Sequence, residues 1–123
     1  MMKSRSFRER IGFALAGIRI AWRREKSFRS QCGLAVAAIA AVAILRPGLA
    51  WTAIVVLTIG LVLLLELVNA ALEYLIDRVH PELHEEIKFA KDAAAGAVLL
   101  ASIAALCVGA LMLASVAWER WLP

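Results

Sequence analysis

Four polar side chains lie at helical spacing on a segment that is otherwise apolar. They belong to Glu66, Asn69, Glu73 and Asp77, and the apolar stretch that leads into them begins at Trp51. At about 100° per residue, all four fall within an arc of about 80° on one face of a helix. An ionisable group inside a membrane-spanning helix is costly and by default marks a functional site. Carboxylates away from water can hold hard cations or accept a proton, so this face predicts metal binding or acid–base chemistry.

The composition indicates an integral membrane protein. Of the 123 residues, 63% are hydrophobic, and the mean hydropathy of +0.79 exceeds what a soluble domain of this size uses to build one core. The net charge is +4, and nine of the 14 Lys and Arg residues precede residue 30. Basic charge concentrated beside the first apolar segment is a topology signal, so no nucleic-acid partner is expected.

A single domain over residues 1–123 is expected to contain four helices. Apolar side chains recur at spacings of three and four among arginines at about 5–24, which predicts an amphipathic surface helix. Apolar runs predict three membrane spans, at about 28–47, 51–72 and 93–118, with a tight turn at Arg46-Pro47-Gly48 after the first. The first span is short, because its uninterrupted apolar run has about 14 residues where a bilayer needs about 20. The predicted fold class is therefore all-α, a three-span membrane protein with an amino-terminal surface helix.

The distribution of Lys and Arg predicts the orientation in the membrane. The amino-terminal segment and the charged link at 73–92 are expected on the cytoplasmic side, with the turn at Arg46 and the carboxyl end outside. The acidic face then begins at the cytoplasmic edge, and Glu66 lies roughly 10–15 Å deeper than the acids at 73 and 77. Shallow acids can meet a water-soluble, metal-bearing ligand, whereas Glu66 can meet a polar group presented from the lipid.

Four blocks of sequence carry a resemblance to a known family. They are Arg24-Glu25-Lys-Ser-Phe28-Arg29, Glu66-Leu-Val-Asn69-Ala-Ala-Leu-Glu73, Ile76-Asp77-Arg78 and Ala90-Lys91-Asp92-Ala-Ala-Ala-Gly96-Ala-Val-Leu. Together they resemble the small bacterial integral-membrane lipid kinases, prokaryotic diacylglycerol kinase and its relative undecaprenol kinase, over about residues 12–102. The resemblance implies a homotrimer with active sites shared between subunits, which uses MgATP to phosphorylate a lipid alcohol. It also implies a bacterial inner membrane, with the amino terminus and the active site cytoplasmic.

Carried over residue by residue, the resemblance gives each matching position an expected role. Glu66 would be the general base, and Glu25 with Glu73 would be the carboxylates that hold Mg²⁺ on the nucleotide. The residues expected to bind nucleotide are Phe13, Gly17, Glu25, Glu73, Asp77, His84, Glu85, Lys91 and Asp92. Those expected to bind the lipid substrate are Trp22, Arg29, Glu66, Asn69 and Ala95. Neutralising phosphate charge while a base receives the alcohol proton is the general requirement of phosphoryl transfer.

The identity of the lipid stays open between the two branches of the family. Ala21-Trp22-Arg-Arg-Glu25 and Asp77-Arg78 are similar to the diacylglycerol branch, whereas Pro81 and Ala93-Ala-Ala-Gly96 are similar to the other. We expect diacylglycerol, with undecaprenol as the alternative. The chain also departs from the family at Phe13, which offers no hydroxyl to a phosphate. The arginine that contacts nucleotide stays open among Arg5, Arg8 and Arg10.

Other classes of protein could explain a glutamate within a span. A small proton-coupled transporter would use Glu66 to carry protons. A non-catalytic scaffold would not explain why an energetically costly ionisable residue lies within a membrane span. The acids continue to the cytoplasmic surface and Lys91 offers complementary charge there, which favours the kinase. The structural alternative for Glu66 is a buried, uncharged glutamate that is hydrogen-bonded to Asn69.

Overall fold

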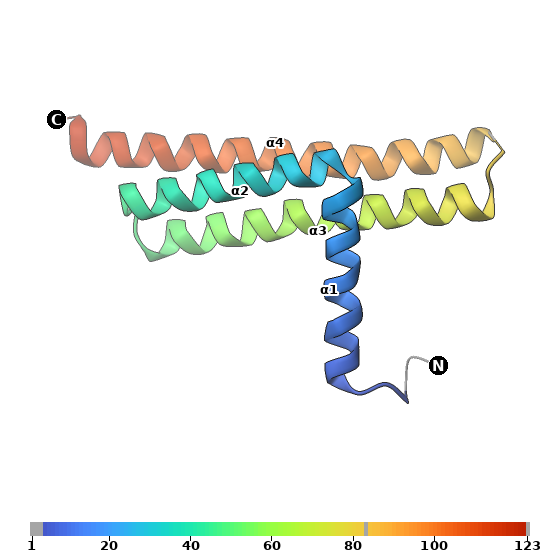
Figure 1. The fold of residues 1–123 in the computed structure, drawn as a ribbon. Helices are drawn as coiled ribbons and strands as arrows, with labels where there is room; N and C mark the ends of the chain where they lie inside the picture. Colours follow the sequence, from blue (N-terminus) through green and yellow to red (C-terminus); the bar gives the residue numbers. More distant parts are fainter. Residues whose placement is uncertain (1–3, 83, 123) are drawn as a thin grey trace.

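The chain forms four helices, three of which lie side by side (Figure 1). A computed structural model describes residues 4–82 and 84–122, and in that part of the chain it contains helices and no strands. The helices are α1 (Phe7–Arg24), α2 (Lys26–Leu45), α3 (Leu49–Val79) and α4 (Glu85–Trp121). In Figure 1, α1 projects sideways from the other three, and α3 and α4 continue together past the start of α2. The predicted all-α class with an amino-terminal helix is confirmed.

The helix boundaries follow from local backbone chemistry. Ser6 caps α1, because its hydroxyl oxygen accepts a hydrogen bond from the backbone N–H of Glu9 at 3.3 Å. A single extended residue, Glu25 (φ −104°, ψ 105°), separates α1 from α2 and redirects the chain. After α2, Arg46 takes a left-handed conformation (φ 48°) and Gly48 has φ 106°, which only glycine adopts readily. The expected turn between the first two spans lies at these residues.

Three helices have the length and composition of membrane spans. They are α2, α3 and α4, with 20, 31 and 37 residues. The chain is therefore an all-α protein with three candidate spans, as its apolar runs predict. α2 reaches the necessary length because it starts at Lys26, ahead of its apolar run, and it ends at Leu45 where the left-handed residue follows. The depth of each helix in a bilayer stays a prediction.

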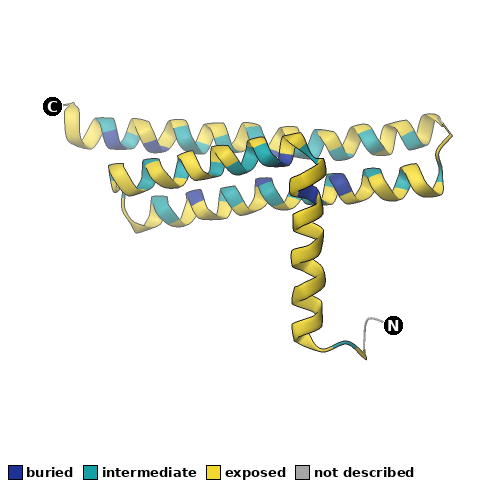
Figure 2. Ribbon diagram, in the orientation of Figure 1, coloured by how far each residue is buried: buried dark blue, intermediate teal, exposed yellow. Residues whose placement is uncertain are grey.

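Little of the surface is buried within one chain (Figure 2). The buried side chains of α3 are Val55, Val62, Glu66 and Ala70, whose spacings of seven, four and four place them on one stripe. Large apolar side chains elsewhere point outward, and Leu57 and Leu106 are each 75% exposed. α1 buries only Ala21 among its residues. Such apolar surface suits contact with lipid or with further copies of the chain.

Candidate active site

Glu66 is a buried carboxylate that receives a hydrogen bond from another helix. Its side chain lies on the buried stripe of α3, and the residue is 6% exposed. It is the buried charged residue of the part of the chain that the structure describes. The hydroxyl of Ser27, in the first turn of α2, donates to Glu66 Oε2 at 3.0 Å. The predicted base therefore sits where two helices meet, and it can accept a hydrogen bond from a hydroxyl group.

Asn69 lies one turn further along α3 and carries an unpaired acceptor. Its Oδ1 atom is buried and has no hydrogen-bond partner among the described residues. The structural alternative, in which Asn69 satisfies Glu66, therefore finds no supporting hydrogen bond in the described chain. A buried acceptor without a partner costs about 1–3 kcal/mol. The expected partner is a donor from outside the described chain.

Glu25 is held against α3 at the corner between α1 and α2. The phenol of Tyr74 donates a short hydrogen bond to Glu25 Oε1. The guanidinium carbon of Arg24 lies 5.9 Å from the centroid of the Tyr74 ring, within cation–π range. Tyr74 directly follows Glu73 on α3, so the contact holds Glu25 next to the helix that carries the second carboxylate that the resemblance assigns to Mg²⁺. It thus joins residues 49 positions apart in the sequence.

The chemistry of these donors fits a magnesium ion that is shared with phosphate. Mg²⁺ is usually bound through one or two carboxylates and substrate phosphates, and it keeps several waters. Within residues 4–82 and 84–122, no three His, Cys, Asp or Glu side chains are grouped so as to hold an ion alone. Glu25 and Glu73 would supply carboxylate oxygens, and a nucleotide would supply the rest.

A polar pocket lies where the carboxyl end of α3 meets the amino end of α4. Its volume is about 360 Å³, and its charged lining residues include Glu73, Asp77, Lys91 and Asp92. Lys91 Nζ lies 2.6 Å from Asp77 Oδ1, an ion pair that joins the two helices. Lys91 precedes the apolar stretch expected at 93–118, and its hydrogen bond to Asp77 raises the pKa of its ammonium group. The pocket therefore presents a fixed cation beside several carboxylates.

The predicted nucleotide residues divide between this pocket and other places. Glu73, Asp77, Lys91 and Asp92 line it, and so does Ala95, which was expected at the lipid. His84 instead caps α4, because its Nδ1 accepts from the N–H of Glu86 at 3.1 Å, and Glu85 begins that helix exposed.

The expected site residues of the amino-terminal helix lie outside the pocket lining of one chain. Phe13 and Gly17 are exposed on α1, where Phe13 contacts the Arg5 guanidinium at 4.4 Å from the ring centroid. Arg29 Nη1 donates to the carbonyl oxygens of Trp22 at 2.7 Å and Arg23 at 3.1 Å, so it caps the end of α1.

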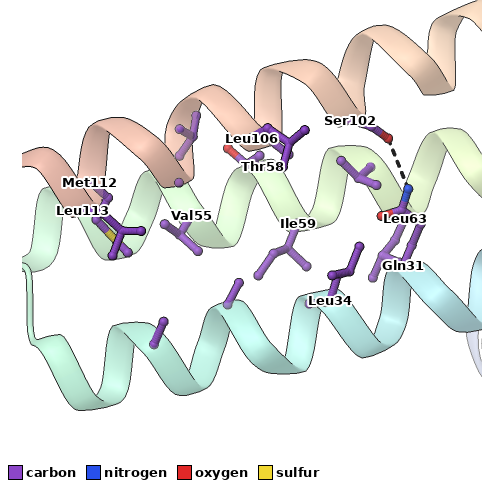
Figure 3. Close-up of a pocket in the computed structure, with 17 residues that line it drawn as sticks. Gln31, Leu34, Val55, Thr58, Ile59, Leu63, Ser102, Leu106, Met112 and Leu113 are labelled. Atoms are coloured by element: carbon purple, nitrogen blue, oxygen red, sulfur yellow. Dashed lines mark hydrogen bonds between the residues drawn. The ribbon is translucent and has the colours of Figure 1, made fainter.

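An apolar groove extends along the bundle from Gln31 toward the carboxyl end of α2 (Figure 3). It is lined by α2, α3 and α4 and has a volume of about 360 Å³. At one end, the amide of Gln31 donates to the hydroxyl oxygen of Ser102 at 3.1 Å, as the dashed line in Figure 3 marks. Gln31 lies one turn after Ser27 on α2. The groove therefore begins one helical turn from the hydroxyl that meets Glu66.

Two contacts of this site, made by Ser27 and Tyr74, were not predicted from the sequence. Ser27 lies two residues after Glu25, and Tyr74 lies next to Glu73, so both were within reach of the expected site. A polar side chain next to a predicted ligand is only a weak signal of such a contact. The spacing of residues along one helix does not determine which side chains of another helix they meet.

Comparison with known proteins places the chain in a family. The profile of prokaryotic diacylglycerol kinase matches residues 12–113, most of the chain. The chain belongs to the prokaryotic diacylglycerol kinase family. A diacylglycerol kinase of Synechocystis sp. is 44% identical over 102 residues, which are 82% of this chain and 58% of that protein. The diacylglycerol kinase of Escherichia coli strain K12 is 34% identical over 103 residues, 83% of this chain and 84% of that protein.

Family membership confirms the resemblance drawn from the four sequence blocks. A third relative, the diacylglycerol kinase of Haemophilus influenzae, is 32% identical over 78% of each chain. The expected class of a diacylglycerol kinase type phosphotransferase agrees with the names of these relatives, and the alternative of a transporter does not. With its three candidate spans and bacterial relatives, the chain is a bacterial membrane protein of a lipid kinase family.

Proposed function

We propose that this protein transfers the γ-phosphoryl group of MgATP to the free hydroxyl of diacylglycerol, which forms phosphatidic acid. The observation that carries the proposal is the buried Glu66 carboxylate, which already accepts a hydrogen bond from a hydroxyl group. Lipid kinases need a base at the depth of the lipid hydroxyl and charged groups at the water surface. Glu66 and the polar pocket meet these two needs on the same helix, α3.

Glu66 is the group that receives the proton of the acceptor hydroxyl. As the lipid oxygen attacks the γ-phosphorus, its proton passes to the carboxylate, and the bond from phosphorus to the leaving oxygen of ADP breaks. Asn69 Oδ1, buried and without a partner in the described chain, can accept a hydrogen bond from the one free hydroxyl of diacylglycerol as it approaches Glu66. Diacylglycerol rather than undecaprenol is the acceptor supported by the names of the relatives.

Residues at the water surface hold the nucleotide. Lys91 lies in the polar pocket with its charge fixed by Asp77, and it can turn toward a phosphate group. Glu25 and Glu73 would hold Mg²⁺, which supplies neutralisation of the charge on the β- and γ-phosphates. The hydrogen bond from Tyr74 keeps Glu25 near α3, which supports a metal site between these two helices.

The proposed assembly is a homotrimer with sites shared between copies. Phe13 and Gly17 on α1 are expected at the nucleotide, yet they lie outside the pocket lining of their own chain. The exposed apolar sides of α2, α3 and α4 leave room for further copies. Mixing Gly17→Leu with Glu66→Gln subunits should restore activity if each site takes its α1 residues from one copy and Glu66 from another. Mixed assemblies as inactive as each parent would contradict sharing.

One assay tests the proposed reaction and its acceptor together. The purified protein, in mixed micelles with saturating MgATP, is given diacylglycerol or undecaprenol, and labelled phospholipid and ADP are both measured. We expect phosphatidic acid in step with ADP, and a higher kcat/KM for diacylglycerol. Turnover of undecaprenol with negligible turnover of diacylglycerol would reverse the choice of lipid. Formation of neither phospholipid would refute the proposed function.

A further inference from the structure

We propose that Ser27 is a positioning residue that orients the Glu66 carboxylate for proton transfer. This inference rests on the proposed function, because it assigns Ser27 a part in the same reaction. Ser27 Oγ donates to Glu66 Oε2 at 3.0 Å across the contact between α2 and α3. It is the hydrogen-bond partner that the described residues offer to this carboxylate.

The start of α2 leaves the Ser27 hydroxyl free to serve another helix. Serine inside a helix often donates to the carbonyl oxygen four residues earlier. Ser27 is the second residue of α2, and the chain breaks at Glu25, so its own helix has no carbonyl at that position. The hydroxyl proton therefore has no local acceptor within α2 and is directed to the carboxylate on α3.

The hydrogen bond gives the two oxygens of the Glu66 carboxylate different roles. Oε2 accepts from Ser27, whereas Oε1 has no hydrogen-bond partner in the described part of the chain. A carboxylate in an apolar helix without donors is free to rotate about its terminal torsion, which is broad. With Oε2 held, Oε1 is presented in one orientation as the acceptor for the lipid proton.

The same turn of chain also sets the base relative to the phosphate site. Glu25 and Ser27 are two residues apart, and they contact Tyr74 and Glu66, which are eight residues apart on α3. Eight residues of helix correspond to about 12 Å. The start of α2 is therefore fixed to α3 at two points, one beside the proposed metal carboxylates and one at the base. Ser27 secures the second point.

The first test compares three variants in the lipid phosphorylation assay. Ser27→Ala removes the donor, and kcat should fall about tenfold, the size expected for losing one hydrogen bond to a charged group, with the KM for MgATP unchanged. Ser27→Thr keeps a hydroxyl and should restore most of the lost kcat. The matched control is Ser30→Ala, an exposed serine of the same helix that makes no hydrogen bond within the described chain. Its kcat should equal that of the unchanged protein.

A double-mutant cycle separates a role through Glu66 from an independent one. In a Glu66→Gln background, Ser27→Ala should cause no further loss, because a positioning residue has nothing left to position. Multiplied losses in the double variant would overturn the inference, as would full kcat in Ser27→Ala. A lowered unfolding midpoint that tracks the lost activity would make Ser27 structural and equally overturn it. Failure of the unchanged protein to phosphorylate any lipid alcohol would instead refute the proposed function.

Discussion

Replacing Asn69 by leucine should stabilise the protein and reduce its activity. Asn69 Oδ1 is buried without a partner in the described chain, and such an acceptor costs about 1–3 kcal/mol. Leucine has the same branching and the same number of side-chain heavy atoms as asparagine, and it has no polar atom to satisfy. Because Asn69 as a whole is only half-buried, we expect a gain near the lower end, about 1 kcal/mol. The gain would identify a residue that is kept for function at the expense of stability.

The control for this prediction is an amide that does have a partner. Gln31 donates to Ser102 at 3.1 Å, so Gln31→Leu leaves a hydroxyl unpaired and should destabilise by about 0.5–1.5 kcal/mol. Both variants are unfolded by raising the fraction of dodecyl sulfate in mixed micelles, and kcat/KM for lipid is measured in parallel. Asn69→Leu should be more stable than Gln31→Leu. Its kcat/KM for lipid should be lower than that of the unchanged protein. If Asn69→Leu destabilises as much as Gln31→Leu, Oδ1 is paired in the assembled protein and the reasoning is wrong.

Two further predictions concern the nucleotide. Glu25→Ala and Glu73→Ala should each raise the Mg²⁺ concentration needed for half-maximal activity while the KM for lipid stays nearly constant, because each removes one proposed metal ligand; unchanged Mg²⁺ titrations in both variants would contradict the assignment. Lys91→Met should raise the KM for MgATP about tenfold through a lost phosphate contact. Its stability should change by less than about 1 kcal/mol, because the ion pair with Asp77 is solvent-exposed. A large loss of stability at unchanged KM would make Lys91 a structural residue.

The helices and the acidic face could be predicted because they depend on periodicity along one segment. The apolar runs of the second and third spans have the length that a bilayer requires, and the spacing of Glu66, Asn69 and Glu73 fixes a common face whatever the neighbouring helices do. The turn after the first span could be predicted because Gly48 needs a positive φ that glycine tolerates. These features are local, so the sequence contains them directly.

Contacts between helices could not be predicted in the same way. The hydrogen bonds from Ser27 to Glu66 and from Tyr74 to Glu25 depend on how α2 and α3 are rotated and offset, which spacing within one helix does not fix. The break at Glu25 carries no proline or glycine to signal it. The role of His84 as a helix cap was also not predicted, because serine, threonine, aspartate and asparagine are the usual caps.

The most direct test of the central claim is the rate at which the Glu66→Gln variant forms phosphatidic acid. The change keeps the volume of the side chain and its ability to hydrogen-bond with Ser27, but it removes the basicity. Positioned acid–base groups typically contribute about 10²–10⁴-fold, and kcat should fall by that factor at saturating MgATP and diacylglycerol in a normally assembled protein. A Glu66→Gln protein that assembles normally and keeps most of its turnover would show that Glu66 is not the base.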